Sequence, residues 1–376
     1  MKMITRAELI GWEMPEDMIS WFVGQYPEGV ARYQNVLDEF ASQDRCDWAN
    51  RLMDVAGTEP GRVTVFSPCE NAKHVFAAGD LSALGSVRVS GFVRVAGDTD
   101  VAHDFHADAG IVCAGSVTVG GSLQTADRLT IQGSTKVGGS IVAKKGMVVR
   151  ETVTVGDDLR TEAGNIDAEN GLEVGGTIWA NGFVRADLVS VDQALVATGD
   201  VTLHGGMHCE GEIRITGNFL LLGATGWSHL EAKGDLVVKG NLQCEGAIRA
   251  ARIEIGGDLR CDRFITAESD IVVERGLVCC DRISSWHGHI KVGASLSAGG
   301  RILAGREIIA GEIFIAPEDA IYAGTLISPE HWASEGRVIV PHRPDRVASG
   351  HWIPAAPEDL GQSDSDAASH PFTACN

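Results

Sequence analysis

Two short segments of the chain gather imidazole and carboxylate side chains, the groups that bind metal ions and transfer protons. One segment runs from Asp98 to Asp108 and the other from His204 to Glu210. A protein metal site needs three or four such groups that converge on one point. The candidate metal ligands are His103, His106, Asp108, His204 and His208. We favour the alternative that these are solvated surface side chains, and we expect neither a metal nor a cofactor.

The sequence lacks the motifs of common catalytic sites. It has no Ser nucleophile elbow, no HExxH pair and no Walker-type loop. Its Gly-Gly pairs precede expected strands rather than helices, so they form no phosphate-binding turn. We therefore expect no catalytic residue and no enzyme activity. A metal-dependent or carbohydrate-active β-helix enzyme that uses one of the His/Asp groups is the second alternative.

A six-residue repeat fills the middle of the chain. Large, mostly apolar residues recur at every sixth position from Val87 to Leu159, and the repeat resumes after one-residue slips and ends at Ile327. Two residues after the large position stands a small or β-branched residue, and the residue between them is often charged. This alternation is typical of a three-residue strand whose first and last side chains point inward and whose middle side chain points outward. Gly frequently stands two residues before the large position, which suits a tight corner.

The repeat predicts a mainly β fold, a single-stranded parallel β-solenoid of about 13 three-sided coils with three hexads per coil. Five cysteines fall on the small inward position, and we expect them in the core: Cys113, Cys209, Cys244, Cys261 and Cys279. In such a coil Asp98 and Asp104 occupy equivalent corners of neighbouring faces. They would therefore not lie side by side at a metal ion.

The two ends of the chain do not follow the repeat. The first residues predict short amphipathic helices, with a capping box at Thr5 and Glu8. We divide the chain into a small α-helical cap domain (1–60), a linker with the first coil (61–84), the β-solenoid (85–327), a C-terminal capping segment (328–345) and a mostly disordered tail (346–376).

Most outward positions of the repeat are polar, but several near the C-terminal end are apolar. An exposed apolar patch suggests a protein contact, and a fold-back of residues 329–360 over the patch is an equal alternative. Trp286 and His287 stand at a slip of the repeat, where a local bulge could also be a contact point. The candidate contact residues are Leu303, Ile309, Phe314, Tyr322, Trp286 and His287.

Charge and composition limit the partners and the location. The chain has 51 acidic and 31 basic side chains, a net charge of −20, and no run of Lys or Arg. This disfavours binding to nucleic acid or to anionic membranes, and it fits either a basic protein partner or simple solubility. The sequence has no apolar run of about 18 residues, the length that a helix needs to span a membrane. The first residues do not read as a signal peptide, so we expect a cytoplasmic protein.

The repeated Gly-x-[Ile/Leu]-x-[Ala/Val/Cys] pattern, as in residues 234–238 (GDLVV) and 257–261 (GDLRC), resembles the bactofilin repeat over residues 85–327. Bactofilins are bacterial polymer-forming cytoskeletal β-helices, so the resemblance implies a solenoid that can self-assemble. The repeat region is about twice as long as a typical bactofilin core, and the helical N-terminal domain is not a bactofilin feature. The pattern of hexapeptide acyltransferases has the large and small inward positions exchanged, so acyl transfer is not implied.

These observations favour a non-catalytic scaffold that offers an acidic lateral surface to a protein partner. A basic toxin, neutralised by an immunity-type protein, is one such partner. The alternative is a self-assembling, bactofilin-like scaffold with the apolar positions near Ile309 and Phe314 in the contact.

Overall fold

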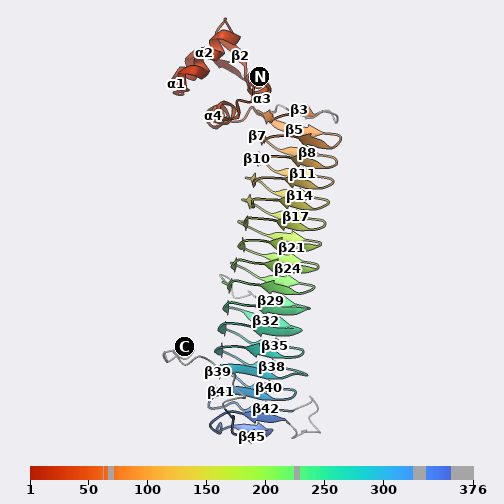
Figure 1. Cartoon of the computed structure of the whole chain (residues 1–376), viewed down its shortest axis with the longest axis vertical. Coiled ribbons are helices and arrows are strands. Elements are labelled where there is room, and N and C mark those ends of the chain that lie inside the picture. Colours follow the sequence, from red (N-terminus) through yellow and green to blue (C-terminus); the bar gives the residue numbers. More distant parts are fainter. Residues whose placement is uncertain (62, 67–71, 224–228, 325–335, 357–376) are drawn as a thin grey trace. The chain divides into compact units, whose positions relative to one another are not determined.

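The computed structural model describes residues 1–61, 63–66, 72–223, 229–324 and 336–356. The described chain is mainly β and forms a parallel β-solenoid of about 15 turns, slightly more than the 13 expected, with four helices near its N-terminus (Figure 1). Its two compact units, residues 1–181 and 182–376, are described in turn. No helix in the described ranges is long and apolar enough to cross a membrane.

The first unit begins with a helical module, residues 1–57. A capping box starts its first helix as predicted, because the Glu8 N–H donates to Thr5 Oγ1 (3.2 Å) and the Thr5 N–H donates to Glu8 Oε2 (2.8 Å). Strands β1 and β2 pair in an antiparallel ladder. The elements of the module are β1 (Met3–Thr5), α1 (Arg6–Gly11), α2 (Glu16–Gln25), β2 (Val30–Arg32), α3 (Tyr33–Ser42) and α4 (Cys46–Ala56).

The module has a compact aromatic core that extends onto the first coil. Phe22, Tyr33 and Phe40 are fully buried, and the same cluster includes Phe76 and Ala78 of the coil. Apolar side chains on one face of each short helix must pack against a neighbour, since helices of this length are unstable alone. The first coil supplies part of that neighbour.

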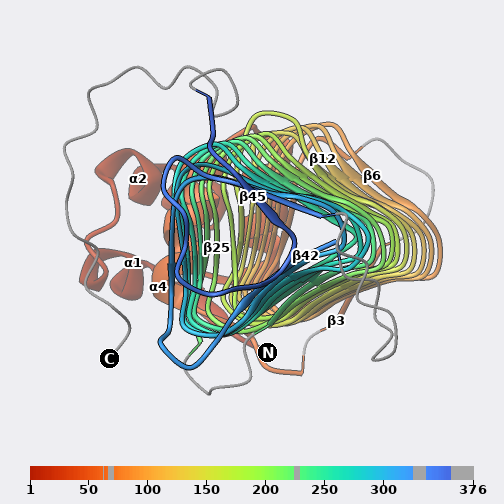
Figure 2. The same cartoon turned by 90° about the horizontal axis from the view of Figure 1, so that it is seen from below.

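The remaining strands of the first unit lie on three faces, which we call A, B and C. Figure 2 shows the resulting three-sided coils. Face A contains β3 (Val63–Phe66), β5 (Asp80–Ala83), β8 (Thr99–Val101), β11 (Val117–Val119), β14 (Thr135–Val137), β17 (Val153–Val155) and β20 (Leu172–Val174). Face B contains β6 (Val87–Val89), β9 (Phe105–Ala107), β12 (Leu123–Thr125), β15 (Ile141–Ala143), β18 (Leu159–Thr161) and β21 (Thr177–Ala180). Face C contains β4 (Val75–Ala77), β7 (Val93–Val95), β10 (Ile111–Cys113), β13 (Leu129–Ile131), β16 (Met147–Val149) and β19 (Ile166–Ala168).

The second unit repeats the three faces. Its face A contains β23 (Val189–Val191), β26 (Met207–Cys209), β29 (His229–Ala232), β32 (Ala247–Ala250), β35 (Ile265–Ala267), β38 (Ile283–Ser285), β40 (Ile302–Ala304), β42 (Ile321–Ala323) and β44 (Val347–Ser349). Its face B contains β24 (Ala194–Ala197), β27 (Ile213–Ile215), β30 (Asp235–Val238), β33 (Arg252–Ile255), β36 (Ile271–Val273), β43 (Arg337–Ile339) and β45 (His351–Ile353). Its face C contains β22 (Val184–Ala186), β25 (Val201–Leu203), β28 (Phe219–Leu221), β31 (Leu242–Cys244), β34 (Leu259–Cys261) and β37 (Leu277–Cys279). Two longer strands, β39 (Ile290–Ala298) and β41 (Ile308–Ile315), pass from face B to face C.

The strands bury their residues as the hexads predict. In β10, for example, Ile111 and Cys113 are fully buried while Val112 points outward. Ile111 pairs with Leu129 of the next coil, 18 residues later, so like residues stack in register. The corners need glycine where coils approach closely, since a Cβ at Gly120 would overlap the carbonyl oxygen of Ala102. The core is therefore a column of aliphatic side chains inside each unit.

Polar corner residues form a ladder between successive coils. The Asp98 N–H donates to Asp80 Oδ1 (2.9 Å), and the Ser116 N–H donates to Asp98 Oδ1 (2.8 Å). The same pattern recurs in the second unit, where the Asn218 N–H donates to Asp200 Oδ1 (2.7 Å). A backbone N–H at a corner cannot join a strand ladder, so the side chain of the preceding coil satisfies it.

The strands continue past the predicted end of the solenoid. We expected a cap over 328–345 and a tail over 346–376, but β43, β44 and β45 pair in parallel with β41, β42 and β43. The sequence allows one short strand at 338–340, and β43 overlaps this range. No hexad pattern marks β44 and β45, so the sequence does not indicate them. Residues 328–335 of the expected cap and 357–376 of the expected tail lie outside the described residues, as do 67–71 of the linker.

Candidate functional site

The first predicted metal group does not converge. His106 Nε2 lies 2.7 Å from Asp108 Oδ1 in an exposed pair at the edge of β9, and His103 is exposed at a corner. Asp98 and Asp104 each accept a backbone N–H of the following coil, from Ser116 and Ser122. These carboxylates hold coils together, which accounts for the concentration of acidic residues in this segment.

The second predicted group is a cluster of ion pairs on face A. His208 Nε2 lies 2.8 Å from Glu210 Oε1, and His208 Nδ1 lies 3.5 Å from Glu231 Oε2. Lys233 Nζ lies 2.5 Å from Glu210 Oε2, and the hydrogen bond to this ammonium lowers the pKa of Glu210. His204 is exposed at a corner. A lysine on the carboxylate disfavours a metal cation at this place.

Within the described residues, one other group brings three possible metal ligands within 4.8 Å of one another: Asp44, Cys46 and His74. It lies between the helical module and the first coil, and no spacing in the sequence pointed to it. His74 Nε2 lies 2.7 Å from Asp44 Oδ1, and the Phe92 N–H donates to His74 Nδ1 (3.1 Å). The bond to Nδ1 places the ring proton of neutral His74 on Nε2, facing Asp44.

This arrangement suits a clamp better than a metal site. Lys73 Nζ lies 2.8 Å from Asp44 Oδ2, and its hydrogen bond is the main cause that lowers the pKa of this carboxyl. Burial raises the pKa of Cys46, so its thiol is not activated as a ligand. Both ring nitrogens of His74 are already engaged. The group therefore fastens the module to the coil.

Further contacts hold the module on the coil and close the free edge of β4. The Gln34 side chain donates to the carbonyl of Phe76 (2.6 Å) and accepts from the Ala78 N–H (2.9 Å). These groups lie on the side of β4 away from β7, where another strand would otherwise pair. Arg94 of β7 also donates to the Asn50 carbonyl (3.1 Å). The helical module thus covers this strand edge.

The five cysteines expected in the core are all buried. Cys244, Cys261 and Cys279 pair in register on successive coils of face C. Burial raises the pKa of Cys113 to about 12. The burial of these thiols fits the role of small core residues.

The apolar residues near the C-terminal end do not form one patch. Leu303 pairs with Tyr322 on face A. Ile309 pairs with Lys291 on face B, and Phe314, 51% exposed, follows on face C. Leu303 and Tyr322 lie on face A, whereas the long strand β41 carries Ile309 on face B and Phe314 on face C. Their role in a contact stays a prediction.

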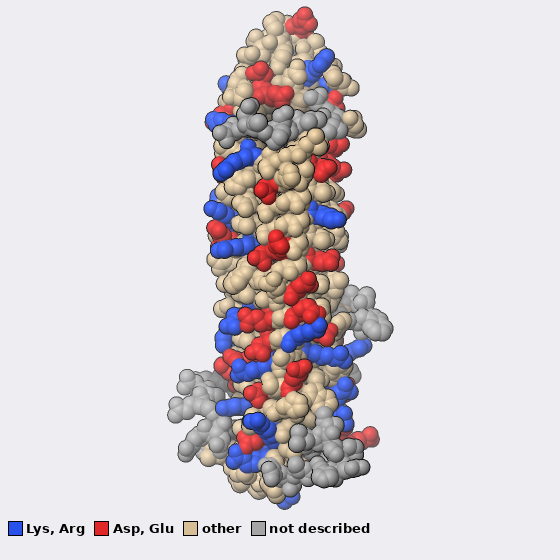
Figure 3. Space-filling view, turned by 90° about the vertical axis from the view of Figure 1, so that its right-hand side faces the viewer, with Lys and Arg blue, Asp and Glu red and all other residues tan. Residues whose placement is uncertain are grey.

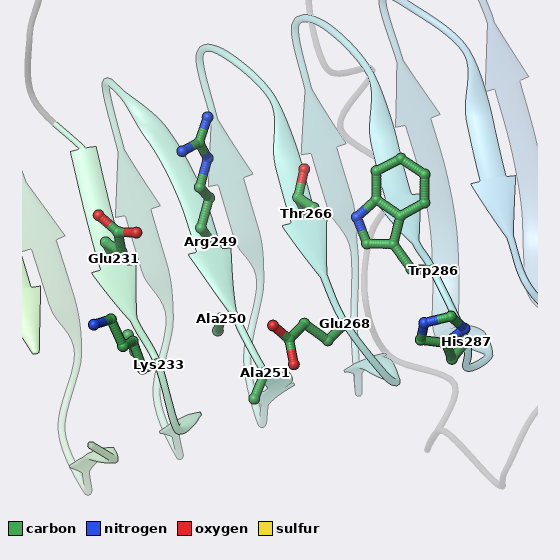
Figure 4. A pocket seen from close by; sticks show the side chains of 10 residues that line it. Glu231, Lys233, Arg249, Ala250, Ala251, Thr266, Glu268, Trp286 and His287 are labelled. Carbon is green, nitrogen blue, oxygen red and sulfur yellow. The ribbon is translucent and has the colours of Figure 1, made fainter. Parts of the chain in front are cut away.

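Trp286 and His287 do line a groove of about 590 Å³ on face A of the second unit (Figure 4). The groove spans β29, β32, β35 and β38. Figure 4 shows Lys233 on one side and His287 on the other, with Ala250 and Ala251 between them. Ala250 is the buried inward end of β32, whereas the small, partly exposed Ala251 leaves space between Lys233 and Glu268.

The charged side chains of the groove differ in their engagement. Lys233 pairs with Glu210, and the Arg249 guanidinium lies 5.2 Å from the centre of the Phe264 ring. Glu231 has one longer contact, to His208. For Glu268 no side-chain hydrogen bond or ion pair occurs within the described part of the chain. The groove therefore presents the carboxylates of Glu231 and Glu268, whereas the cationic groups of Lys233 and Arg249 contact Glu210 and Phe264.

Sequence reasoning found Trp286 and His287 but missed Glu231, Arg249 and Glu268. Outward charged residues occur in most hexads, so none of these stood out. Register is the signal that could have found them, because Glu231, Arg249 and Thr266 face one another on successive strands at separations of 18 and 17 residues.

The wider surface carries both signs of charge. Figure 3 shows acidic and basic side chains interspersed on the side turned to the viewer. Pairs such as Lys145 with Asp127 (3.0 Å) and Lys239 with Glu254 (3.1 Å) link neighbouring coils. Ion pairs between coils therefore neutralise part of the acidic charge.

A family model described as the YdhT N-terminal domain matches residues 1–57. The matched stretch ends one residue after α4, so it coincides with the helical module. No match was found among curated proteins or among solved structures. The similarity to the YdhT N-terminal domain thus concerns the module alone, and the bactofilin resemblance of the coils stays a prediction.

Proposed function

We propose that this chain is a non-catalytic binding scaffold whose coil faces, in particular face A of the second unit, contact a protein partner. The main support is the closed strand edge at the helical module. Gln34 and α3 occupy the side of β4 to which another strand would add. Because this edge cannot accept a further strand, a partner would bind to the faces of the coils.

The chemistry of the surface favours a basic partner. Acidic side chains exceed basic ones by 51 to 31, and the groove on face A presents carboxylates. An acidic surface speeds association with a basic protein and makes it sensitive to salt. A basic toxin that this scaffold neutralises, as an immunity-type protein would, belongs to this class of partner.

Affinity capture with the full chain tests the proposal. The immobilised protein is incubated with native lysate beside an unrelated acidic protein of similar net charge, and bound proteins are eluted with a salt gradient. We expect a basic protein that the control does not retain and that elutes as salt rises. If both columns retain the same proteins, the proposal is wrong.

The second candidate is a self-assembling scaffold, which the bactofilin resemblance implies. One observation favours it: within the described residues, β44 and β45 each pair with a strand on one side only. Exposed edges of this kind can accept a strand from another molecule. Light scattering and negative-stain microscopy distinguish the candidates, since filaments support self-assembly and discrete particles support the binding scaffold.

A further inference from the structure

We propose that the groove on face A of the second unit binds an arginine side chain of the protein partner, between the Trp286 ring and the carboxylate of Glu268, which is level with Trp286 on the neighbouring coil. The inference rests on the proposed function and specifies the chemistry of its contact. The groove of about 590 Å³ has room for a side chain of this kind, and the small Ala251 lies beside Glu268 (Figure 4).

The first support is that the cationic side chains of the groove contact other residues, whereas the Glu268 carboxylate has no such contact among the described residues. Lys233 Nζ lies 2.5 Å from Glu210, outside the groove, and Arg249 lies over the Phe264 ring. Figure 4 shows the Arg249 side chain pointing away from Glu268. The Glu268 carboxylate has no partner in the described ranges of the chain, so the groove presents an acceptor without its cation.

The second support is the combination of an indole with a carboxylate. Trp286 is half-buried at the end of β38, and its indole N–H makes no hydrogen bond to the described residues. An aromatic face attracts a cation, and tryptophan does so best. A guanidinium also stacks on a ring through its plane and donates two parallel hydrogen bonds to a carboxylate. Arginine therefore matches the groove better than lysine does.

The test uses the full chain, labelled with ¹⁵N, and the blocked peptide acetyl-Gly-Arg-Gly-amide. Counterparts with lysine or with neutral citrulline in place of arginine complete the set. The indole N–H signal of Trp286, assigned as the one missing from Trp286→Phe, is followed during titration. We expect the arginine peptide to shift this signal, and the citrulline peptide to bind about tenfold more weakly because it lacks the charge.

Two variants localise the contact. Glu268→Gln removes one groove carboxylate, and Glu274→Gln removes an exposed carboxylate at a different corner. We expect Glu268→Gln to weaken binding of the arginine peptide about fivefold to tenfold and Glu274→Gln to leave it unchanged. Equal effects of the two variants would overturn the inference, since they would indicate a general attraction to an acidic surface. Equal binding of the citrulline peptide would overturn it as well.

The inference and the proposed function fail separately. If Glu268→Gln and Trp286→Phe still capture the basic partner of the intact chain with unchanged salt dependence, the partner binds elsewhere and only the arginine site is wrong. If the intact chain captures no basic partner but the arginine peptide binds the groove, the site stands and the proposed function is wrong.

Discussion

The helical module packs large aromatic side chains around one centre, whereas each coil buries only the two ends of three-residue strands. Phe22 comes from α2, Tyr33 and Phe40 come from α3, and all three belong to one buried cluster of the module. In the coils Ile111 meets Leu129, the equivalent residue one turn later. The module should therefore unfold as one unit, while the coils depend mainly on their nearest neighbours.

The largest expected effect compares one core residue in each region. Phe22→Ala should destabilise the module by about 3–5 kcal/mol, and Leu236→Ala should destabilise its coil by about 2–5 kcal/mol. Hydrogen exchange separates the two responses. We expect Phe22→Ala to accelerate exchange throughout residues 1–57, and Leu236→Ala to accelerate it only in adjacent coils. Uniform acceleration over all coils by Leu236→Ala would contradict the nearest-neighbour description.

A second prediction concerns the junction between the regions. A Cβ on Gly91 would lie 2.5 Å from two atoms of the His74 ring, whereas one on Gly24 of α2 would meet nothing within 4 Å. Gly91→Ala should therefore cost about 1–3 kcal/mol through overpacking. Gly24→Ala, its control, should stabilise the module by about 0.5–1 kcal/mol. Chemical denaturation measures both, and equal values would show that the junction adapts freely.

A third prediction opens the covered strand edge. Gln34→Ala leaves the Phe76 carbonyl and the Ala78 N–H without partners, which should cost about 1–2 kcal/mol. The freed edge should also promote association, visible as a higher mass by light scattering. Gln25→Ala serves as the control, since it removes an exposed amide of the same module that makes no side-chain hydrogen bond to the described residues. An unchanged mass for Gln34→Ala would mean that α3 alone blocks the edge.

A smaller effect is expected from pH. Hydrogen bonds from Lys73 and then His74 lower the folded-state pKa of Asp44. Its contribution to the clamp is therefore fully present above the unfolded pKa of about 4 and is lost as pH falls through the lowered folded value. The carboxyl carbon of Asp44, followed by NMR, should titrate below its usual range. Asp44→Asn should remove this dependence; if it does not, another group is responsible.

The last prediction concerns the rate at which cysteines of the unmutated chain are alkylated. Because burial raises the pKa of Cys113 to about 12, alkylation at pH 8 should be far slower there than at the half-buried Cys46. Mass spectrometry of labelled peptides gives both rates. Added denaturant should increase the rate at Cys113 only as its coil opens, and rapid labelling in buffer would contradict a closed core.

The sequence predicts the coils well because every hexad repeats one rule: the ends of the strand point inward and its middle points outward. Burial in β10 follows that rule residue by residue. The junction could not be predicted, since Asp44 and His74 meet only after the module folds against the coil. To predict the groove one must know which residues pair between β29 and β38. The one-residue slips of the repeat make this register uncertain from the sequence. The apolar residues at 303–322 were grouped by closeness in sequence, but they are distributed over faces A, B and C.

The corner ladder also has a direction, because each acceptor belongs to the earlier coil and each donor to the later one. Asp80 accepts from Asp98, and Asp98 in turn accepts from Ser116. During synthesis from the N-terminus, a new coil leaves the ribosome when the acceptors that fix its corners are already in place. The helical module precedes the coils in the sequence and can start this series. We expect the ladder to favour folding of the coils in order along the chain, one turn at a time.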